Sequence, residues 1–298
     1  MTERASSKTA LGVAALRAAH QLMDGDPKIL DDPIIPRLLE AELLERIRTG
    51  LDSLQAPWAL RLRAHVLLRS RYAEDRLAVA VENGMRQYVL LGAGLDTFAY
   101  RQPPWARNLR IFEVDHPASQ QAKRARLAAA GIAIPPNVEF VAIDFESVSL
   151  RAGLLASSLE LGQPAFFSCL GVLVYLTEEA VDALFGLVAT LPEPSELIFT
   201  FSPPTSSLQA MEAGSRTALA AMVEKLGEPW RTHLDPETLA GKLKGLGFER
   251  LELLSPEESE ERYFRGRSDS LRAPKHARIA RAVVGKHSRH NHSVEVAG

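Results

Sequence analysis

The sequence predicts an α/β protein with a doubly wound, mostly parallel sheet of seven strands. Three observations support this prediction. Short apolar runs alternate with helical segments from residue 88 onward. Most of these runs are largely apolar, which is typical of parallel strands covered by helices on both faces. The first run ends at Gly92 and Gly94, where glycines allow the backbone to turn sharply.

The first 86 residues are expected to form a helical cap ahead of the sheet. Their apolar residues recur at helical spacing in three stretches, which span residues 11–18, 38–47 and 58–82. The α/β core is then expected to occupy residues 87–285. The length of 298 residues permits one large domain with additions or two smaller domains.

Six strands are expected in the core, and one further segment is open. The strands cover residues 88–91, 110–114, 138–143, 165–169, 196–201 and 248–254. The last of them alternates apolar and charged residues, which is typical of a strand near a sheet edge. Residues 275–284 form either the seventh strand or a short helix.

Helices are expected between the strands, at residues 116–130, 150–160, 178–190 and 235–246. The last of these has Asp235 as its N-cap, Pro236 at its first position and Gly247 after its end.

Two segments depart from this alternation. The Pro203-Pro204 break opens a helical insertion, residues 202–233, which is expected to form a lid over the sheet. Residues 286–298 are rich in His and Ser and are expected to be a disordered tail.

The composition excludes several classes of protein. Lys and Arg total 35 against 37 Asp and Glu, a formal charge of −2, whereas nucleic-acid-binding proteins usually show a basic excess. No apolar run approaches the roughly 18 residues of a membrane span, and residues 1–20 are too polar for a signal peptide. The single cysteine, Cys169, permits no intramolecular disulfide and no cysteine zinc site. We therefore expect a cytoplasmic protein without a metal, a nucleic-acid partner or a membrane partner; the oligomeric state is open.

The turn after the first strand carries the candidate chemistry. In open α/β sheets ligands bind at the carboxyl ends of the strands, so Gly92-Ala93-Gly94 is placed to approach a ligand closely. Two acidic residues, Glu113 and Asp115, follow Gly94 by 19 and 21 positions, close to the spacing of a ribose-binding carboxylate. These two signals together indicate a nucleoside cofactor rather than a simple tight turn.

The residues around the turn favour one cofactor over others. Thr97 stands where a dinucleotide fingerprint has its third glycine, and the chain contains no P-loop. The carboxylate of Asp96 would repel a pyrophosphate but suits a ligand with an ammonium group and a sulfonium. The expected cofactor is therefore S-adenosylmethionine.

On these motifs the sequence resembles the leucine carboxyl methyltransferase-like family of class I methyltransferases, which have a Rossmann-like fold and include bacterial O-methyltransferases of polyketide pathways. The resemblance spans residues 15–284. The matching segments are Arg69-Ser70-Arg71-Tyr72 with Asp75, Gly92-Ala93-Gly94-Leu95-Asp96-Thr97, Glu113-Val114-Asp115-His116-Pro117, Asp144, the stretch from Ser168 to Thr177, Tyr263-Phe264 and residues 269–272.

The resemblance implies a set of cofactor contacts. The glycine turn would face the methionine moiety, the acids of the second strand the ribose, the residues after the third strand the adenine, and an upstream arginine the cofactor carboxylate. The implied residues are Gly92, Ala93, Gly94, Asp96, Glu113, Asp115, Asp144, Phe145, Leu170 and either Arg69 or Arg71. Leu170 stands where the eponymous enzymes have a glutamate, so their protein phosphatase substrate is not implied.

The expected activity is in-line transfer of a methyl group to an oxygen, carboxyl or hydroxyl, of a small molecule. A carboxylate acceptor needs no base, whereas a hydroxyl gains from one. Candidate bases are Tyr175, His233 and His65, and Cys169 is expected to be a small buried hydrophobe. The residues expected to enclose an apolar ligand, or else to belong to the core, are Phe201, Met211, Met222 and Trp230.

Two alternatives remain open. An NAD-dependent oxidoreductase shares the sheet and the acidic residue, although Thr97 and the helices before the first strand disfavour it. A non-catalytic, cofactor-binding interaction protein is favoured by Leu170 and by the lack of a clear base. A nucleic-acid methyltransferase is disfavoured by the charge balance and by the absence of an Asn- or Asp-Pro-Pro-Tyr motif.

Overall fold

The sheet has the expected seven strands. The computed structural model describes residues 8–50, 54–145, 148–204, 217, 220, 221, 224, 227–275 and 278–285. The sheet order is β3-β2-β1-β4-β5-β7-β6. The strands are β1 (Gln87–Leu91), β2 (Arg110–Asp115), β3 (Val138–Ala142), β4 (Phe166–Cys169), β5 (Glu196–Thr200), β6 (Phe248–Leu253) and β7 (Ile279–Val284).

Pairing within the sheet settles the segment that the sequence left open. Strands β1 to β5 are parallel, and β7 runs antiparallel between β5 and β6. Residues 279–284 form a strand because both of their edges are occupied, with Phe199 opposite Ala280 and Glu252 opposite Arg281. Strand β6 lies at one edge of the sheet, as its alternating pattern predicts, and β3 lies at the other.

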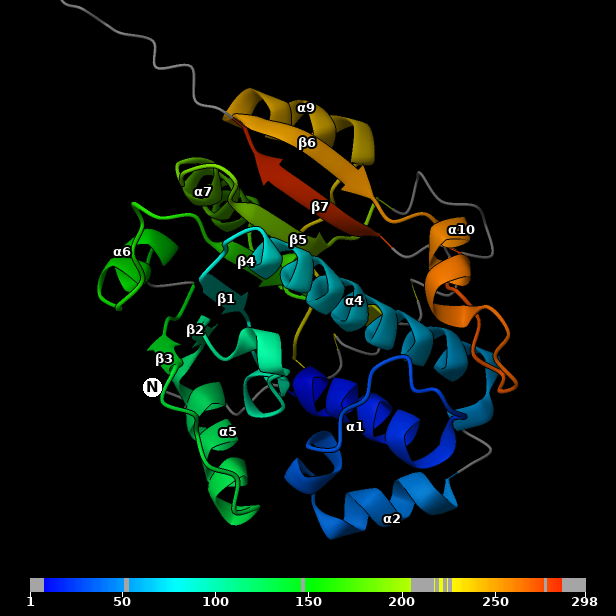
Figure 1. Cartoon of the computed structure of the whole chain (residues 1–298). Helices are drawn as coiled ribbons and strands as arrows, with labels where there is room; N and C mark the ends of the chain where they lie inside the picture. Colours follow the sequence, from blue (N-terminus) through cyan, green and yellow to red (C-terminus); the bar gives the residue numbers. More distant parts are fainter. Residues whose placement is uncertain are drawn as a thin grey trace, which may run out of the picture.

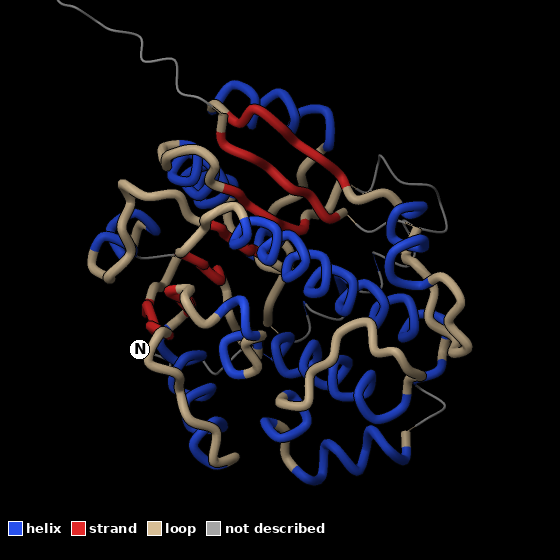
Figure 2. The backbone as a smooth tube through the Cα atoms, viewed as in Figure 1, coloured by secondary structure: helices blue, strands red, loops and turns tan. Residues whose placement is uncertain are grey.

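In the described part of the chain three helices precede the first strand, and the four expected helices of the core alternate with the later strands along the chain. A further short helix separates the last two strands, and Figure 2 shows the helices packed around the sheet. They are α1 (Lys8–Met23), α2 (Ala41–Thr49), α4 (Pro57–Glu82), α5 (Pro117–Ala129), α6 (Leu150–Leu155), α7 (Glu178–Ala189), α9 (Pro236–Leu246) and α10 (Pro256–Ser259). Short turns of helix add η1 (Ile35–Leu38), η2 (Phe98–Tyr100), η3 (Pro104–Ala106), η4 (Leu173–Tyr175) and η6 (Glu260–Phe264).

The ends of two helices follow from local hydrogen bonds. In α9 the Asp235 carboxylate accepts from the Thr238 amide at 3.0 Å, and Gly247 ends the helix with φ 103°, so the predicted caps are confirmed. Helix α6 ends at Leu155, earlier than residue 160, because the Ser157 hydroxyl donates to the Leu154 carbonyl at 2.6 Å and turns the chain.

Helices cover both faces of the sheet. On one face α4 crosses the strands, and its Leu67 and Leu77 share a buried cluster with Tyr88 of β1 and Ile198 of β5 (Figure 1). The opposite face buries residues of α6, α7 and α9 against the same strands. Helix α1 lies beside α2 and α4, beyond the carboxyl end of the sheet (Figure 1). Within the described residues no helix is long and apolar enough to cross a membrane.

Parts of two expected segments lie outside the described residues. Most of the expected lid, residues 202–233, is among them, and so are Met211 and Met222. The expected tail, residues 286–298, also lies outside the described part.

Candidate functional site

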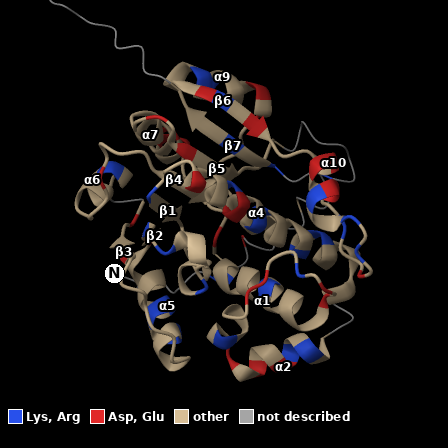
Figure 3. Cartoon of the chain, in the orientation of Figure 1, with Lys and Arg blue, Asp and Glu red and all other residues tan. Residues whose placement is uncertain are grey.

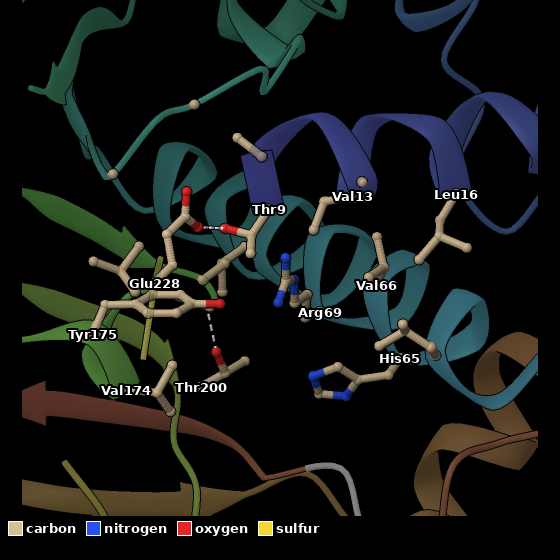
Figure 4. A pocket seen from close by; sticks show the side chains of 18 of the residues that line it. Thr9, Val13, Leu16, His65, Val66, Arg69, Val174, Tyr175, Thr200 and Glu228 are labelled. Carbon is tan, nitrogen blue, oxygen red and sulfur yellow. Dashed lines mark hydrogen bonds between the residues drawn. The ribbon is translucent and has the colours of Figure 1, made fainter. Parts of the chain in front are cut away.

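A large cavity opens at the carboxyl ends of the parallel strands. Its volume is about 2170 Å³, and it is lined from α1, α4, the ends of β1 to β5, residues 227–231, residues 270–275 and Arg278. Pockets for one small ligand commonly measure roughly 300–1,000 Å³, so this cavity has room for two ligands. Figure 4 shows part of its wall, where side chains of α1 and α4 face those that follow β4 and β5.

The glycine turn forms one wall of this cavity. Gly92 and Gly94 have φ of 66° and 48°, in the left-handed region that favours glycine. A Cβ at Gly92 would lie 2.4 Å from a methyl carbon of Val172, so a side chain does not fit there. The turn therefore presents bare backbone to the cavity, with Ala93 between the glycines also in the lining.

Asp115 is bound to this turn and also lines the cavity. Its Oδ2 accepts from the Gly94 amide at 2.5 Å, and its Oδ1 accepts from the His116 amide at 2.7 Å. Burial raises the pKa of Asp115, and the two amide bonds act against that rise. The carboxylate is thus fixed in position at the end of β2, where a hydroxyl-bearing ligand can reach it.

Glu113 does not reach the cavity. It is fully buried, with Lys123 Nζ at 2.7 Å and the Tyr100 hydroxyl donating to it at 3.1 Å. The structure therefore separates the two acids that the sequence considered together for the ribose, and only Asp115 is placed for that role.

Asp96 lines the cavity and is tied to the N-terminal helix. Its Oδ1 accepts from the Phe98 amide at 2.8 Å, and its Oδ2 accepts from Arg17 Nη1 at 3.1 Å. Against the effect of burial, Arg17 and Arg101 hold the pKa of Asp96 below its usual value. Arg17 is itself buried and also donates to Asp32 at 2.6 Å and to Thr97 at 2.9 Å.

Arg17 did not stand out among the candidate residues. The available signal was a single arginine within the Ala-rich, otherwise apolar pattern of residues 11–18, since a charge on a buried helix face needs partners.

Of the two candidate arginines, only Arg69 lines the cavity. Its guanidinium lies against the backbone of Gly171, where a Cβ would come within 2.4 Å of Arg69 Nη1. Burial lowers the pKa of Arg69 to about 10, and no carboxylate of the described residues forms an ion pair with it. Arg71 instead binds Asp75 at 2.8 Å and donates to the Ile29 carbonyl at 3.3 Å.

The expected adenine and fourth-strand residues are also in the lining. Asp144 and Phe145 follow β3, and Leu170 follows β4. They join His116, whose Nδ1 accepts from the Ala118 amide at 3.2 Å at the start of α5. The carboxyl ends of β1 to β4 thus contribute a continuous wall.

The three candidate bases divide between two places. Tyr175 and His65 line the large cavity, and in Figure 4 their side chains and that of Arg69 point into the same space. His233 lies elsewhere, in a small pocket of about 190 Å³ beside Asp182 and Lys242. The arrangement therefore brings Tyr175 and His65 to the site and leaves His233 outside it.

Three other expected residues are placed as follows. Phe201 and Trp230 line the cavity, which fits a role in enclosing a ligand. Cys169 is fully buried, and burial raises the pKa of its thiol to about 12, so it is a buried hydrophobe as expected.

Comparison with known proteins identifies what the chain is similar to. The family model described as leucine carboxyl methyltransferase matches residues 10–189. A Bacillus subtilis (strain 168) protein, provisionally named S-adenosyl-L-methionine-dependent methyltransferase YktD, is 31% identical over 92% of this chain and 96% of its own. A Mycobacterium marinum protein with the same provisional activity is 32% identical over 75% of this chain and 72% of its own.

Two solved structures have the same fold. A protein from Thermobifida fusca, described provisionally as a methyltransferase, gives a TM-score of 0.56 at 18% identity, over 96% of this chain and 97% of its own. A DUF574 family protein from Streptomyces avermitilis gives 0.52 at 19% identity, over 94% and 98%.

Proposed function

The chain belongs to the leucine carboxyl methyltransferase family and is an S-adenosylmethionine-dependent methyltransferase, and from this premise we propose that it methylates an oxygen of a small molecule. The premise decides against the NAD-dependent oxidoreductase and the non-catalytic interaction protein. The observation that carries the proposal is the cavity of about 2170 Å³, which adjoins the glycine turn and exceeds what one cofactor fills.

The residues on the cavity wall fit the cofactor. The bare backbone of Gly92 and Gly94 would face the methionine moiety, and Asp115, which is held to this turn by the Gly94 amide, would accept hydrogen bonds from ribose hydroxyls. Arg69, which has no ion pair within the described part of the chain, would hold the cofactor carboxylate. Asp144 and Phe145 would border the adenine, and Leu170, after β4, would be a further residue of the cofactor site.

Bound in this way, S-adenosylmethionine supplies an electrophilic methyl group. The task of the protein is then to hold the acceptor oxygen in line with the methyl carbon and to exclude water. A carboxylate acceptor requires no proton removal. For a hydroxyl acceptor, Tyr175 or His65 would accept the proton; the position of both in the cavity lining supports this.

The covered shape of the site supports a small acceptor. Glu228 accepts hydrogen bonds from the Thr9 hydroxyl and, at 2.9 Å, from the Lys8 amide, so residues after the expected lid are joined to the start of α1. Both segments line the cavity. An acceptor that passes beneath them is more compatible with a small molecule than with a folded protein surface.

Isothermal titration with S-adenosylhomocysteine tests the cofactor site. We expect binding by the wild type and at least a tenfold loss of affinity, about 1.4 kcal/mol, in Asp115→Ala, because charge-assisted hydrogen bonds are lost. Asp182→Asn, which removes a carboxylate outside the large cavity, serves as the control and is expected to bind normally. Undiminished binding by Asp115→Ala, or none by the wild type, contradicts the site.

Transfer of a tritiated methyl group to a whole bacterial extract, which is afterwards divided into protein and small-molecule fractions, tests the acceptor. A methyl ester releases its label as volatile methanol in alkali, whereas a methyl ether retains it, so the treatment separates carboxyl from hydroxyl acceptors. Label that enters only the protein fraction, or only amine nitrogen, would contradict the proposal.

A further inference from the structure

We propose that the acceptor is a small amphiphilic anion, with an apolar body and an oxyanion such as a carboxylate that Arg278 binds in the part of the cavity beside β5 and β7. This inference rests on the proposed function, because it names the chemistry of the molecule that shares the cavity with the cofactor.

The cavity wall is strongly cationic although the chain is not. Among the described residues that line it, nine are Lys or Arg and four are Asp or Glu, whereas the whole chain has a formal charge of −2. One of the nine, Arg17, is paired with Asp32 and Asp96 and is not available to a ligand. Elsewhere basic and acidic residues are interspersed along the helices and strands (Figure 3). The excess of positive charge is therefore a local property of this wall.

The four acids are already engaged away from β5 and β7. Asp96, Asp115 and Asp144 follow β1, β2 and β3, on the side of the glycine turn, and Glu228 binds the start of α1. None of them follows β5 or precedes β7. None of these four acids therefore lies next to the cations that precede β7, which are Arg272, Lys275 and Arg278.

The cofactor does not explain these cations. S-adenosylmethionine carries one carboxylate against an ammonium and a sulfonium, so its own net charge is positive. A single arginine, Arg69, is sufficient for its carboxylate. Further positive charge on the wall repels this cofactor unless a second, negatively charged ligand is present in the same cavity.

Arg278 is the centre of the proposed anion site. It lies just before β7, where its carbonyl accepts from the Phe201 amide at 3.1 Å, and it lines the cavity with Lys275 and Arg272. Its buried Nε has no hydrogen-bond partner, and the hydroxyl of Ser202, a residue only 3% exposed, has none either. Among the described residues no carboxylate forms an ion pair with Arg278. Both residues line the cavity, and buried donors left unpaired cost free energy, so a ligand there that accepts hydrogen bonds would remove this cost.

The rest of the wall indicates an apolar body. Val13 and Leu16 of α1 face Val66 of α4 across the cavity (Figure 4), and Leu62 adds to the same wall. Trp58, at the start of α4, also lines the cavity while remaining 54% exposed. An apolar chain or ring system can bury this surface while its charged end reaches Arg278.

The test compares a charged and an uncharged amphiphile of the same length. Protein saturated with S-adenosylhomocysteine is titrated with decanoate and with methyl decanoate, and the expected result is at least about tenfold tighter binding of decanoate, which weakens as salt is added. Arg278→Gln is expected to abolish this preference, and Arg278→Lys to retain part of it. Arg151→Gln, an exposed cation of α6 outside the cavity, is expected to leave it unchanged.

Each result bears on a separate claim. Equal affinities for decanoate and its ester in protein that binds S-adenosylhomocysteine overturn the anion site and leave the proposed function standing. Failure to bind S-adenosylhomocysteine at all overturns the proposed function instead. If Arg278→Gln does not fold, Lys275→Gln takes its place, because Lys275 is exposed and belongs to the same cluster of cations before β7. This variant is expected to show a smaller preference for decanoate over methyl decanoate, and an unchanged preference contradicts the anion site.

Discussion

At the scale of single residues, the two candidate arginines show how far spacing along the chain can assign a role. Arg69 and Arg71 are two positions apart on α4, which places their side chains about 200° apart around the helix axis. Only one of them can therefore face the cavity, and the sequence pattern does not say which. The packing of α4 against Gly171 selects Arg69.

Arg69→Gln is expected to weaken cofactor binding without destabilising the free protein. The lowered pKa of Arg69 means that its charged form is less favourable in the folded than in the unfolded chain, so its loss removes a cost of folding. We expect at least a tenfold loss of S-adenosylhomocysteine affinity by titration and an unchanged or higher thermal midpoint. The matched control, Arg71→Gln, loses only a half-exposed pair and is expected to bind normally; the reverse ranking would contradict the assignment.

Asp115 predicts the pH dependence of cofactor binding. Burial raises the pKa of Asp115 in the folded protein, so the folded state favours the protonated carboxyl. The stability that protonated Asp115 contributes to the free protein is therefore present at low pH and is lost as pH rises through the raised pKa. Binding has the opposite sign, because the ionised form accepts the ribose hydroxyls. Affinity for S-adenosylhomocysteine should therefore fall on acidification, starting above the usual Asp pKa of about 3.9. Titrations at successive pH values check this, and Asp115→Asn should flatten the profile; a profile that persists in the variant belongs to another group.

The two acids of β2 show a second limit of sequence spacing. Glu113 and Asp115 point to the same face of the strand and both fit the expected distance from Gly94. Only the residue at the carboxyl end of the strand clears the covering helix, whereas Glu113 lies beneath α5 and pairs with its Lys123. Spacing predicts that a ribose-binding acid is present, and the length of the strand decides which one it is.

At the scale of elements, the strongest link in the site joins α1 to the turn after β1. Arg17 connects Asp32, Asp96 and Thr97 inside the protein, so the first helix is held against the cofactor wall by buried charge. The sequence predicts the helix from its apolar period. The period does not show where the helix docks, since docking depends on partners far away in the chain.

Arg17→Met is expected to destabilise the protein by about 3–5 kcal/mol, because it removes the buried cation that donates to Asp32 and Asp96 and leaves only Arg101, 3.5 Å from Asp32, beside them. Urea denaturation followed by circular dichroism measures this loss. Arg48→Met breaks the exposed pair with Glu45 on α2 and is the control, with an expected loss below about 1 kcal/mol. Similar losses in the two variants would show that the buried network contributes little.

Strand β7 shows why element boundaries at the end of the chain are hard to predict. The first five strands are largely apolar runs that alternate with helical segments, which makes them recognisable from the sequence, but residues 279–284 include Arg281 and fit a helix or a strand. Arg281 is compatible with a buried strand because Glu196 of β5 and Glu252 of β6 bind it at 2.7 Å and 2.9 Å. Those partners come from the neighbouring strands, so only the assembled sheet distinguishes the two outcomes.

At the scale of the whole molecule, the N-terminal cap and the core share their packing. The expected boundary between residues 86 and 87 marks where the sheet begins in the sequence. The buried cluster crosses it, because Leu67 and Leu77 of α4 pack with Tyr88 and Ile198 of the sheet. Helix α4 thus covers one face of the sheet and also forms a wall of the candidate site.

Hydrogen exchange measured by mass spectrometry should therefore find α4 as protected as β1, since both can exchange only when the shared cluster opens. Helix α2, in which only Ile47 is buried, is the internal control and should exchange much faster. Adding S-adenosylhomocysteine at about 100 times its Kd stabilises the folded state by about 2.7 kcal/mol, so exchange in α4 and β1 should slow by the same factor, about 100. If α4 exchanged at the rate of α2, or if the ligand slowed β1 alone, the cap would be opening independently, and the cavity would lose one wall without unfolding of the core.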